Sequence, residues 1–372
     1  MKNLVGACMF GQSGGPTSVI NASAAGVFIE GLSNDMITEV YGAAHGIRGI
    51  LNEEFYDMSK EDMKELELLK NTPSSALGSV RYKLKDASVD DTDYKRLLEV
   101  FKKYDVRYFF YNGGNDSMDT CNKISKYMAK SGYEMNVIGV PKTIDNDLFG
   151  TDHCPGFASA AKYIATSIME INLDAKVYDT PMICVIEVMG RNAGWLTAAA
   201  QLANAKGLGA DLIYLPEIPF DVNKFVADVK DVMAKNNNKC IAVVSEGIKN
   251  ADGVLVCEAL GQVGARDSFG HAQLGGVAAT LANLIKEKTG YKTRGIELSL
   301  MQRCGAHLSS ATDVEESTAS AFGIFWPIVL ALILLIYPLF FIQRVIYDRQ
   351  YRKNKEAAEA KEAGYIDSHY DI

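Results

Sequence analysis

The order of apolar and polar positions along residues 4–301 predicts an α/β fold. Short apolar runs alternate with longer amphipathic stretches, and the clearest runs lie at residues 4–9, 108–111, 137–140, 182–188 and 241–244. Strands that alternate with helices in this way form mostly parallel sheets. Ligands of such folds gather at the carboxyl ends of the strands, so polar motifs that directly follow an apolar run are candidate site residues.

The hydrophobic pattern changes after Glu316. Residues 322–342 read FGIFWPIVLALILLIYPLFFI, without a charged side chain, which predicts a C-terminal hydrophobic helix that spans a membrane. The alternative is a helix buried in the core. A basic flank and a polar tail follow at 343–372. The positive-inside tendency would place this tail in the cytoplasm and the preceding domain outside. The absence of an N-terminal signal instead favours a cytoplasmic location for that domain, with the hydrophobic helix as a C-terminal membrane anchor.

Composition narrows the choice of ligands. The chain has 372 residues, 48% of them hydrophobic, and a formal charge of -8, so it has a large core and no general attraction for nucleic acid. Phosphate ligands must therefore be bound by a compact group of cations. Seven cysteines are scattered without a CxxC pair, which favours a reducing, cytosolic setting, and the five histidines lack the spacing of zinc ligands.

Two glycine-containing motifs follow apolar runs. In GQSGGPTSVIN, residues 11–21, glycines would let backbone N–H groups approach a phosphate at a helix start. In YNGGNDSMDT, residues 111–120, Asn115 and Asp116 would lie where a carboxylate can hold Mg²⁺. Each motif has a purely structural alternative, a tight turn in the first and a capped helix start in the second.

The segment GVPKTIDND, residues 139–147, is the most specific. Alternate positions of an extended segment point the same way, so Thr143, Asp145 and Asp147 can converge on one ligand. Phosphoryl transfer needs a carboxylate that accepts the proton of the attacking hydroxyl and a cation beside the transferred phosphate. Asp145 and Lys142 fit these two roles.

Further candidates lie in the second half of the chain. Arg191, in EVMGR, follows an apolar run and a glycine, and it is suited to a sugar phosphate. Glu246, in SEG, could accept hydrogen bonds from sugar hydroxyls, and Arg294 and Arg303 could bind a 6-phosphate. Each of these alone is more often a surface residue.

Together, SGGPTSVIN, GGNDS, PKTIDND, EVMGR, SEG and MQR resemble the phosphofructokinase family over residues 1–322. The resemblance implies that Gly14 lies against the phosphoryl donor, Asp145 is the general base, Asp147 supports the metal or transition state, and Arg81 meets the transferred phosphate. It implies Mg²⁺ as cofactor, with Asn115 and Asp116 at the metal. The residues implied for fructose 6-phosphate are Thr143, Met189, Gly190, Arg191, Glu246, Arg294 and Arg303.

The resemblance also implies a domain organisation. Residues 1–158 would form an N-terminal lobe that binds the donor and Mg²⁺, and residues 159–301 a second lobe that binds fructose 6-phosphate. Residues 302–321 would form a helix that returns toward the first lobe. Family members assemble as dimers or tetramers with substrate residues contributed across an interface, so a homodimer or homotetramer is expected.

The donor is inferred from two positions at which ATP-using relatives generally have glycine, here Asp116 and Lys142. The aspartate would repel a nucleotide's inner phosphate, and the lysine would compensate the charge of compact pyrophosphate. The expected activity is therefore a pyrophosphate-dependent 6-phosphofructokinase. Three departures from the family stand out: Asn115 replaces a metal-binding aspartate, Leu300 replaces a polar or aromatic ligand, and the ending after residue 322 differs.

Two alternatives stay open. One is an ATP-dependent 6-phosphofructokinase. The other is a catalytically impaired, membrane-tethered protein that binds sugar phosphate, which the altered ending suggests.

Overall fold

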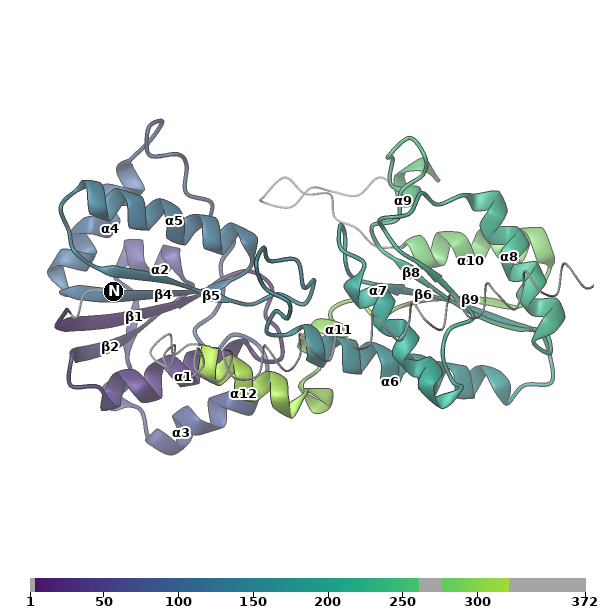
Figure 1. Ribbon diagram of the computed structural model, residues 1–372, viewed down its shortest axis with the longest axis horizontal. Coiled ribbons are helices and arrows are strands. Elements are labelled where there is room, and N and C mark those ends of the chain that lie inside the picture. Colours follow the sequence, from purple (N-terminus) through teal and green to yellow (C-terminus); the bar gives the residue numbers. More distant parts are fainter. Residues whose placement is uncertain (1–3, 261–275, 321–372) are drawn as a thin grey trace, which may run out of the picture. The chain divides into compact units, whose positions relative to one another are not determined.

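The computed structural model describes residues 4–260 and 276–320, and its N-terminal part is built on a five-stranded sheet (Figure 1). The strand order is β3-β2-β1-β4-β5, with only the β2–β3 pair antiparallel. The strands are β1 (Gly6–Gln12), β2 (Ile37–Ala43), β3 (Phe55–Asp57), β4 (Val106–Gly113) and β5 (Asn136–Pro141). The carboxyl ends of β1, β4 and β5 therefore meet at one edge of the sheet.

Helices cover both faces of this sheet because its strands are apolar on both sides. Along β1, Ala7 and Met9 pack into one layer, and Cys8 and Phe10 pack into the other. The first layer is closed by α2 (Ile47–Asn52), α4 (Thr92–Lys103) and α5 (Asn115–Lys130), and the second by α1 (Ile20–Ser33) and α3 (Met63–Leu68) (Figure 1). Such two-sided burial is typical of parallel sheets.

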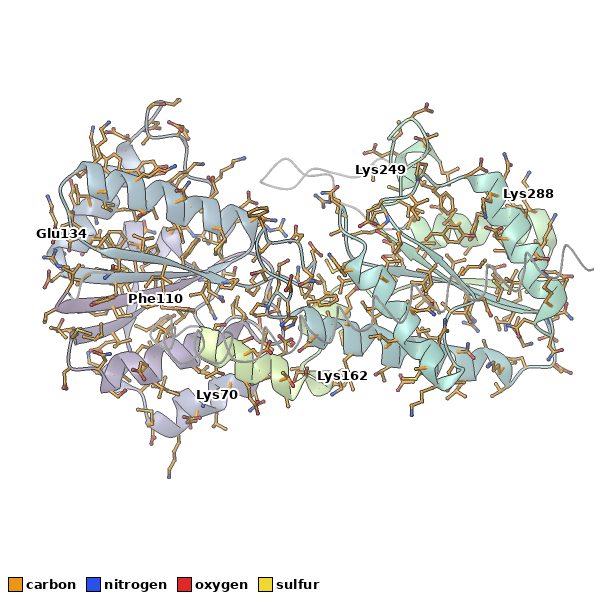
Figure 2. All side chains as sticks on the ribbon, in the orientation of Figure 1. Lys70, Phe110, Glu134, Lys162, Lys249 and Lys288 are labelled. Atoms are coloured by element: carbon orange, nitrogen blue, oxygen red, sulfur yellow. The ribbon has the colours of Figure 1, made fainter. Side chains whose placement is uncertain are left out.

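A second sheet follows in the chain, with all four strands parallel in the order β7-β8-β6-β9. The strands are β6 (Met182–Val188), β7 (Leu212–Tyr214), β8 (Lys239–Ser245) and β9 (Thr293–Glu297). Ile183 and Val185 of β6 pack with α8 (Val222–Lys235) and α10 (Val277–Thr289), whereas Cys184 and Ile186 pack with α6 (Phe157–Lys176) and α7 (Trp195–Ala199). Figure 2 shows the side chains that fill these layers, with Lys162 and Lys288 outside them.

The remaining helices are α9 (Val256–Ala259), α11 (Met301–Cys304) and α12 (Ala311–Ser320), and short 3-10 turns lie at Met58–Lys60, Leu69–Asn71, Ala200–Lys206 and Ala306–Leu308. Helix α12 packs against α1. The expectation of an α/β fold with mostly parallel sheets is confirmed. The exact lobe boundaries stay predictions.

The predicted membrane segment, residues 322–342, lies outside the described residues, as do the basic flank and tail. Within residues 4–260 and 276–320, no helix combines the length and apolarity needed to cross a membrane.

Candidate active site

The loop after β5 carries the strongest sequence motif, and its burial alternates. The buried side chains are Lys142, Ile144 and Asn146, and the more exposed ones are Thr143, Asp145 and Asp147. This is the alternation expected of an extended segment. Thr143, Asp145 and Asp147 are therefore on the outer side of the loop, at the carboxyl end of the sheet.

Lys142 is only 5% exposed, and its Nζ donates a hydrogen bond of 2.7 Å to the carbonyl oxygen of Gly15. Burial, assisted by the positive charges of Arg303 and Arg81, lowers the pKa of Lys142 to about 7, against the opposing effect of Asp145. A lysine held in this way is ready to gain a proton and bind tightly when an anion arrives.

Asp145 is the partly buried carboxylate of the loop. Burial and the negative charge of Asp147 raise its pKa to about 6, although Arg191, Lys142 and Arg303 act in the opposite direction. Its backbone N–H donates to Thr143 Oγ1 at 3.2 Å, which stiffens the turn. At neutral pH the carboxylate is ionised and basic enough to accept a proton, as a general base must be.

The turn after β1 brings backbone close to these side chains. Gly14 has a φ of +77°, in the left-handed region that favours glycine, and a Cβ there would lie 3.3 Å from Lys142 Nζ. A Cβ on Gly15 would collide with the guanidinium of Arg303. Both glycines therefore leave room for cations beside the backbone.

Arg81 lies on a segment that runs against the same turn. Ser79 Oγ donates to Gly14 O at 2.6 Å, and Val80 O accepts hydrogen bonds from the N–H of Gly14 at 3.4 Å and from Ser13 Oγ at 3.2 Å. The charge of Arg81 contributes to the lowered pKa values of Lys142 and Arg303. These three cations thus form a group close enough to repel one another, which an anion would stabilise.

Asn115 and Asp116 open α5 and are exposed. Asn115 Nδ2 donates to Asp147 Oδ2 at 2.9 Å, so the start of α5 is tied directly to the loop after β5. Lys142 N–H donates to Gly113 O at 3.0 Å, just before this helix. The two acidic motifs predicted separately from the sequence are therefore adjacent in the fold.

The end of β6 supplies Met189, Gly190 and Arg191, and the end of β8 supplies Glu246. Gly190 N–H donates to Glu246 Oε1 at 3.4 Å, and Gly190 O accepts a 2.7 Å hydrogen bond from Ser245 Oγ. Burial and the charge of Asp145 raise the pKa of Glu246 to about 7, whereas Arg191 opposes this. The charge of Asp145, at the end of the first sheet, therefore reaches Glu246, at the end of the second, and the two sheet ends belong to one site.

Arg303 of α11 completes the cationic side of the site. Its Nε is buried and finds no hydrogen-bond partner among the described residues. Burial and the charge of Arg81 lower the pKa of Arg303. A buried guanidinium donor without a partner is costly, and an anionic ligand would satisfy it.

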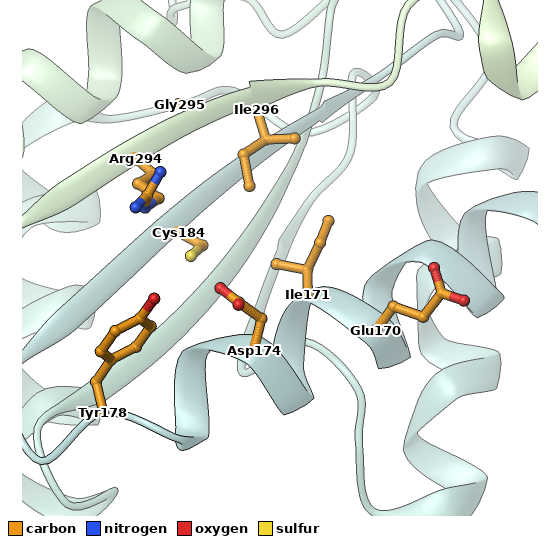
Figure 3. Close-up of a pocket in the computed structure, with 8 residues that line it drawn as sticks. All are labelled: Glu170, Ile171, Asp174, Tyr178, Cys184, Arg294, Gly295 and Ile296. Atoms are coloured by element: carbon orange, nitrogen blue, oxygen red, sulfur yellow. The ribbon is translucent and has the colours of Figure 1, made fainter.

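Arg294 lies elsewhere. Arg294 is the second residue of β9, and its backbone lies opposite that of Cys184 in the neighbouring strand β6. This position is well before the carboxyl ends of the strands, where Met189 and Glu246 follow. Arg294 lines a cavity of about 570 Å³ together with Asp174 and Tyr178 (Figure 3). Within one copy of the chain, the structure therefore does not bring Arg294 to the other predicted ligands.

Three residues of the site were missed by reasoning from the sequence. Gln302, 2% exposed, accepts the Met189 N–H at 3.0 Å and so ties α11 to the end of β6. Asn146 holds the acidic loop, because its Oδ1 accepts from Cys154 N–H at 2.7 Å and its Nδ2 donates to Asp152 O at 3.1 Å. Ser245 supports Gly190. All three stand inside motifs already recognised, which was the available signal.

The chemistry of this arrangement is that of transfer to an alcohol. A basic carboxylate, Asp145, lies near a cationic group formed by Lys142, Arg81 and Arg303. The carboxylate can take a hydroxyl proton, and the cations can stabilise charge on a phosphoryl group. Among the described residues, no group of three or more His, Cys, Asp or Glu could hold a metal ion alone.

Comparison with known proteins gives consistent matches. The family model described as phosphofructokinase matches residues 8–325. A pyrophosphate--fructose 6-phosphate 1-phosphotransferase of Halomonas elongata is 47% identical over 315 residues, covering 83% of this chain and 74% of that protein. The Xanthomonas campestris pv. campestris protein of the same name is 49% identical over 320 residues, covering 84% and 74%.

A solved structure agrees with these matches. The crystal structure of a pyrophosphate-dependent phosphofructokinase from Nitrosospira multiformis has a TM-score of 0.74 and 41% identity, covering 85% of this chain and 74% of that chain.

Proposed function

The chain belongs to the phosphofructokinase family, and we propose that it transfers a phosphoryl group from pyrophosphate to the 1-hydroxyl of fructose 6-phosphate. The products are fructose 1,6-bisphosphate and phosphate. The observation that carries the proposal is the buried Lys142, held against Gly15 O between Asp145 and the charges of Arg81 and Arg303. The names of the similar proteins support the same donor and acceptor.

In this proposal Asp145 is the general base. It takes the proton of the 1-hydroxyl while that oxygen attacks the near phosphorus of pyrophosphate, and phosphate leaves with the electrons of the bridging bond. Its pKa of about 6 keeps the carboxylate ionised at neutral pH. Asp147, tied to Asn115, supports the loop that aims this carboxylate.

The cationic group acts on the donor. Lys142 and Arg81 balance the charge that spreads over the transferred phosphoryl group, and the turn at Gly14 lets the donor approach the backbone. Asp116, exposed at the start of α5, disfavours the inner phosphate of a nucleotide. Pyrophosphate is smaller and carries no nucleoside part, so it does not need that position.

The sugar phosphate is held by the ends of the second sheet and by α11. Arg191 and Arg303 bind the phosphate, Glu246 accepts hydrogen bonds from sugar hydroxyls, and Thr143, Met189 and Gly190 form the wall. The distance of Arg294 from these residues is consistent with a homodimer or homotetramer in which Arg294 serves the site of another copy. A cytoplasmic location belongs to the same proposal, because its substrates are cytoplasmic metabolites.

Mg²⁺ fits the donor side of the site. Asn115 donates its amide to Asp147, which leaves the amide oxygen of Asn115 and the exposed carboxylate of Asp116 as available ligands. This set is too small to hold the ion without oxygens from the substrate, as is usual for Mg²⁺ with phosphates. When bound, the ion would neutralise charge on pyrophosphate.

The experiment is phosphoryl transfer to fructose 6-phosphate by the full-length protein in mild detergent, with Mg²⁺ and either pyrophosphate or ATP. Turnover with pyrophosphate and at least tenfold less with ATP is expected. Faster turnover with ATP would overturn the donor assignment, and binding of fructose 6-phosphate without turnover would favour the binding-only alternative.

A variant pair tests the residues behind that assignment. Replacing Asp116 and Lys142 together by glycine should lower pyrophosphate turnover at least 100-fold, a typical loss for a removed charge-stabilising group. Asp119→Gly, also on α5, controls for the cost of a glycine in this helix. Equal losses in both proteins would contradict a specific role of Asp116 and Lys142.

A further inference from the structure

Asp313, on α12, is a fully buried carboxylate far in the sequence from the loop that carries Asp145. Its Oδ1 accepts the backbone N–H of Gly156 at 2.9 Å, and its Oδ2 accepts the N–H of Ser159 at 3.0 Å and the Ser159 hydroxyl at 2.5 Å. Every one of these donors belongs to the start of α6. Ser159 Oγ in turn accepts from the N–H of Ser310, just before α12.

The carboxylate replaces a cap that α6 lacks. This helix has 20 residues, and its N-cap residue, Gly156, makes no side-chain cap hydrogen bond. The first N–H groups of a helix need acceptors, and a negative charge there is favourable. Asp313 supplies both the acceptor oxygens and the negative charge, although it is 157 positions away from Gly156 in the sequence. The cap therefore forms only when α12 is in place.

Gly156 is also the far end of the acidic loop. It forms an isolated parallel bridge with Thr143, whose N–H donates to Pro155 O at 3.2 Å. Between these two points, Asn146 closes the loop by its hydrogen bonds to Asp152 and Cys154. A shift of Gly156 would therefore move the backbone on both sides of Asp145.

A second contact joins the same two parts of the chain. His153 Nδ1 donates to Glu316 Oε2 at 2.9 Å, one helical turn after Asp313, and His153 Nε2 lies 3.8 Å from Asp313 Oδ1. Glu316 is 53% exposed, so this contact contributes little by itself. Asp313 and Glu316 nevertheless both lie next to His153, so one face of α12 borders the loop at two points.

We propose that Asp313 is a positioning residue for phosphoryl transfer: by capping α6 and holding Gly156, it fixes the loop that carries Thr143, Asp145 and Asp147. The inference rests on the proposed function for its catalytic consequence. Its structural part, that α12 anchors this loop, does not depend on the identity of the substrates. Asp313 touches neither substrate nor reacting atoms, and it acts through Gly156 and Ser159.

The test compares Asp313→Asn and Asp313→Ala with the unmodified full-length protein. Glu315→Gln, an exposed change on the same helix, is the matched control. Asparagine keeps one acceptor oxygen and is the milder change, and Ser159→Ala, which removes one donor, approaches the same contact from α6. The first measurement is hydrogen–deuterium exchange of peptides that cover residues 142–160.

We expect exchange in this region to be at least tenfold faster in Asp313→Ala, with an intermediate effect in Asp313→Asn and none in Glu315→Gln. The value of kcat with pyrophosphate should fall about 10- to 100-fold, since small misplacements of a catalytic group are costly. The KM for fructose 6-phosphate should change less than threefold, because the charged groups proposed to bind it, Arg191, Arg303 and Glu246, lie on other elements. Thr143 is the one proposed ligand on the loop.

The pH profile separates positioning from general loss of folded protein. Burial raises the pKa of Asp145, so a loosened loop should move the acidic limb of kcat/KM to lower pH. Unchanged exchange in the Asp313 variants would overturn the anchoring, and unchanged kcat with faster exchange would overturn its catalytic role. If the unmodified protein transfers no phosphate, the proposed function fails, and the exchange measurement alone decides whether α12 anchors the loop.

Discussion

Replacing Lys142 by methionine should make the ligand-free protein more stable at pH 7 while it abolishes most activity. The ammonium is 5% exposed, and burial together with Arg303 and Arg81 lowers its pKa from 10.5 to about 7. In the unfolded chain the group is hydrated and keeps its ordinary pKa. The unfolded chain therefore binds the proton more tightly, and folded-state stability falls as the pH decreases from about 10 to about 7.

The magnitude follows from the two pKa values. A change from 10.5 to about 7 corresponds to about 5 kcal/mol of penalty on the protonated form in the folded state, to order of magnitude. Methionine is free of this penalty but loses the 2.7 Å hydrogen bond to Gly15 O, which contributes about 1 kcal/mol. The net gain in the free energy of unfolding at pH 7 is expected between about 2 and 5 kcal/mol.

Urea unfolding of both proteins without ligand, at pH 7 and pH 10, measures this difference. The advantage of Lys142→Met should be clear at pH 7 and shrink toward pH 10, where the lysine is neutral in the folded state. Pyrophosphate with Mg²⁺ should stabilise the unmodified protein much more than the variant, and turnover should fall about 10²- to 10³-fold in the variant.

Lys162→Met is the matched control, since Lys162 is exposed and also donates to a backbone carbonyl, that of Ser309 at 3.2 Å. Its stability should not rise at pH 7. A Lys142→Met protein that is less stable than the unmodified one at pH 7 would refute the reasoning, because it would mean that the folded protein favours the ammonium.

Three further predictions concern the site. Asp145→Asn should lower kcat about 10²- to 10⁴-fold. In the unmodified protein, kcat/KM should decline as the pH falls through about 6, where Asp145 becomes protonated. A pH profile that stays flat down to pH 5 would exclude Asp145 as the base. Gly15→Ala should raise the KM for fructose 6-phosphate at least tenfold, because the new methyl group displaces Arg303. Steady-state kinetics measures this change, with an unchanged circular dichroism spectrum as the control for folding. An unaltered KM would count against Arg303 as a phosphate ligand. Gln302→Ala should cost about 1–3 kcal/mol in urea unfolding, since the N–H of Met189 loses its acceptor, and no loss would indicate that another group replaces it.

Much of the site was predictable because its residues stand in short motifs at strand ends. The carboxyl ends of parallel strands lie at one edge of a sheet, so an α/β fold places the motifs after β1, β4 and β5 at that edge. The strand order then makes them neighbours. The alternating burial around Asp145 follows from the two-residue period of an extended segment. These are local properties, and the sequence displays them directly.

The placement of Arg294 was not predictable in this way. The residue type suits a phosphate ligand, but only the pairing of Arg294 with Cys184 shows that it lies far from the carboxyl ends of the strands. Strand register depends on how whole side-chain layers pack, and no short motif encodes it.

The sequence by itself determined the fold class, the order of the motifs and the chemical character of the site: a loop with Lys142 and Asp145, glycines beside it, and arginines farther along the chain. Only the tertiary structure decided which distant groups meet. The approach of Arg303 to Gly15 and the capping of α6 by Asp313 join residues far apart in the chain. The burial that shifts the pKa values of Lys142 and Asp145 arises in the same way, because desolvation is a property of the packed chain and not of its local sequence.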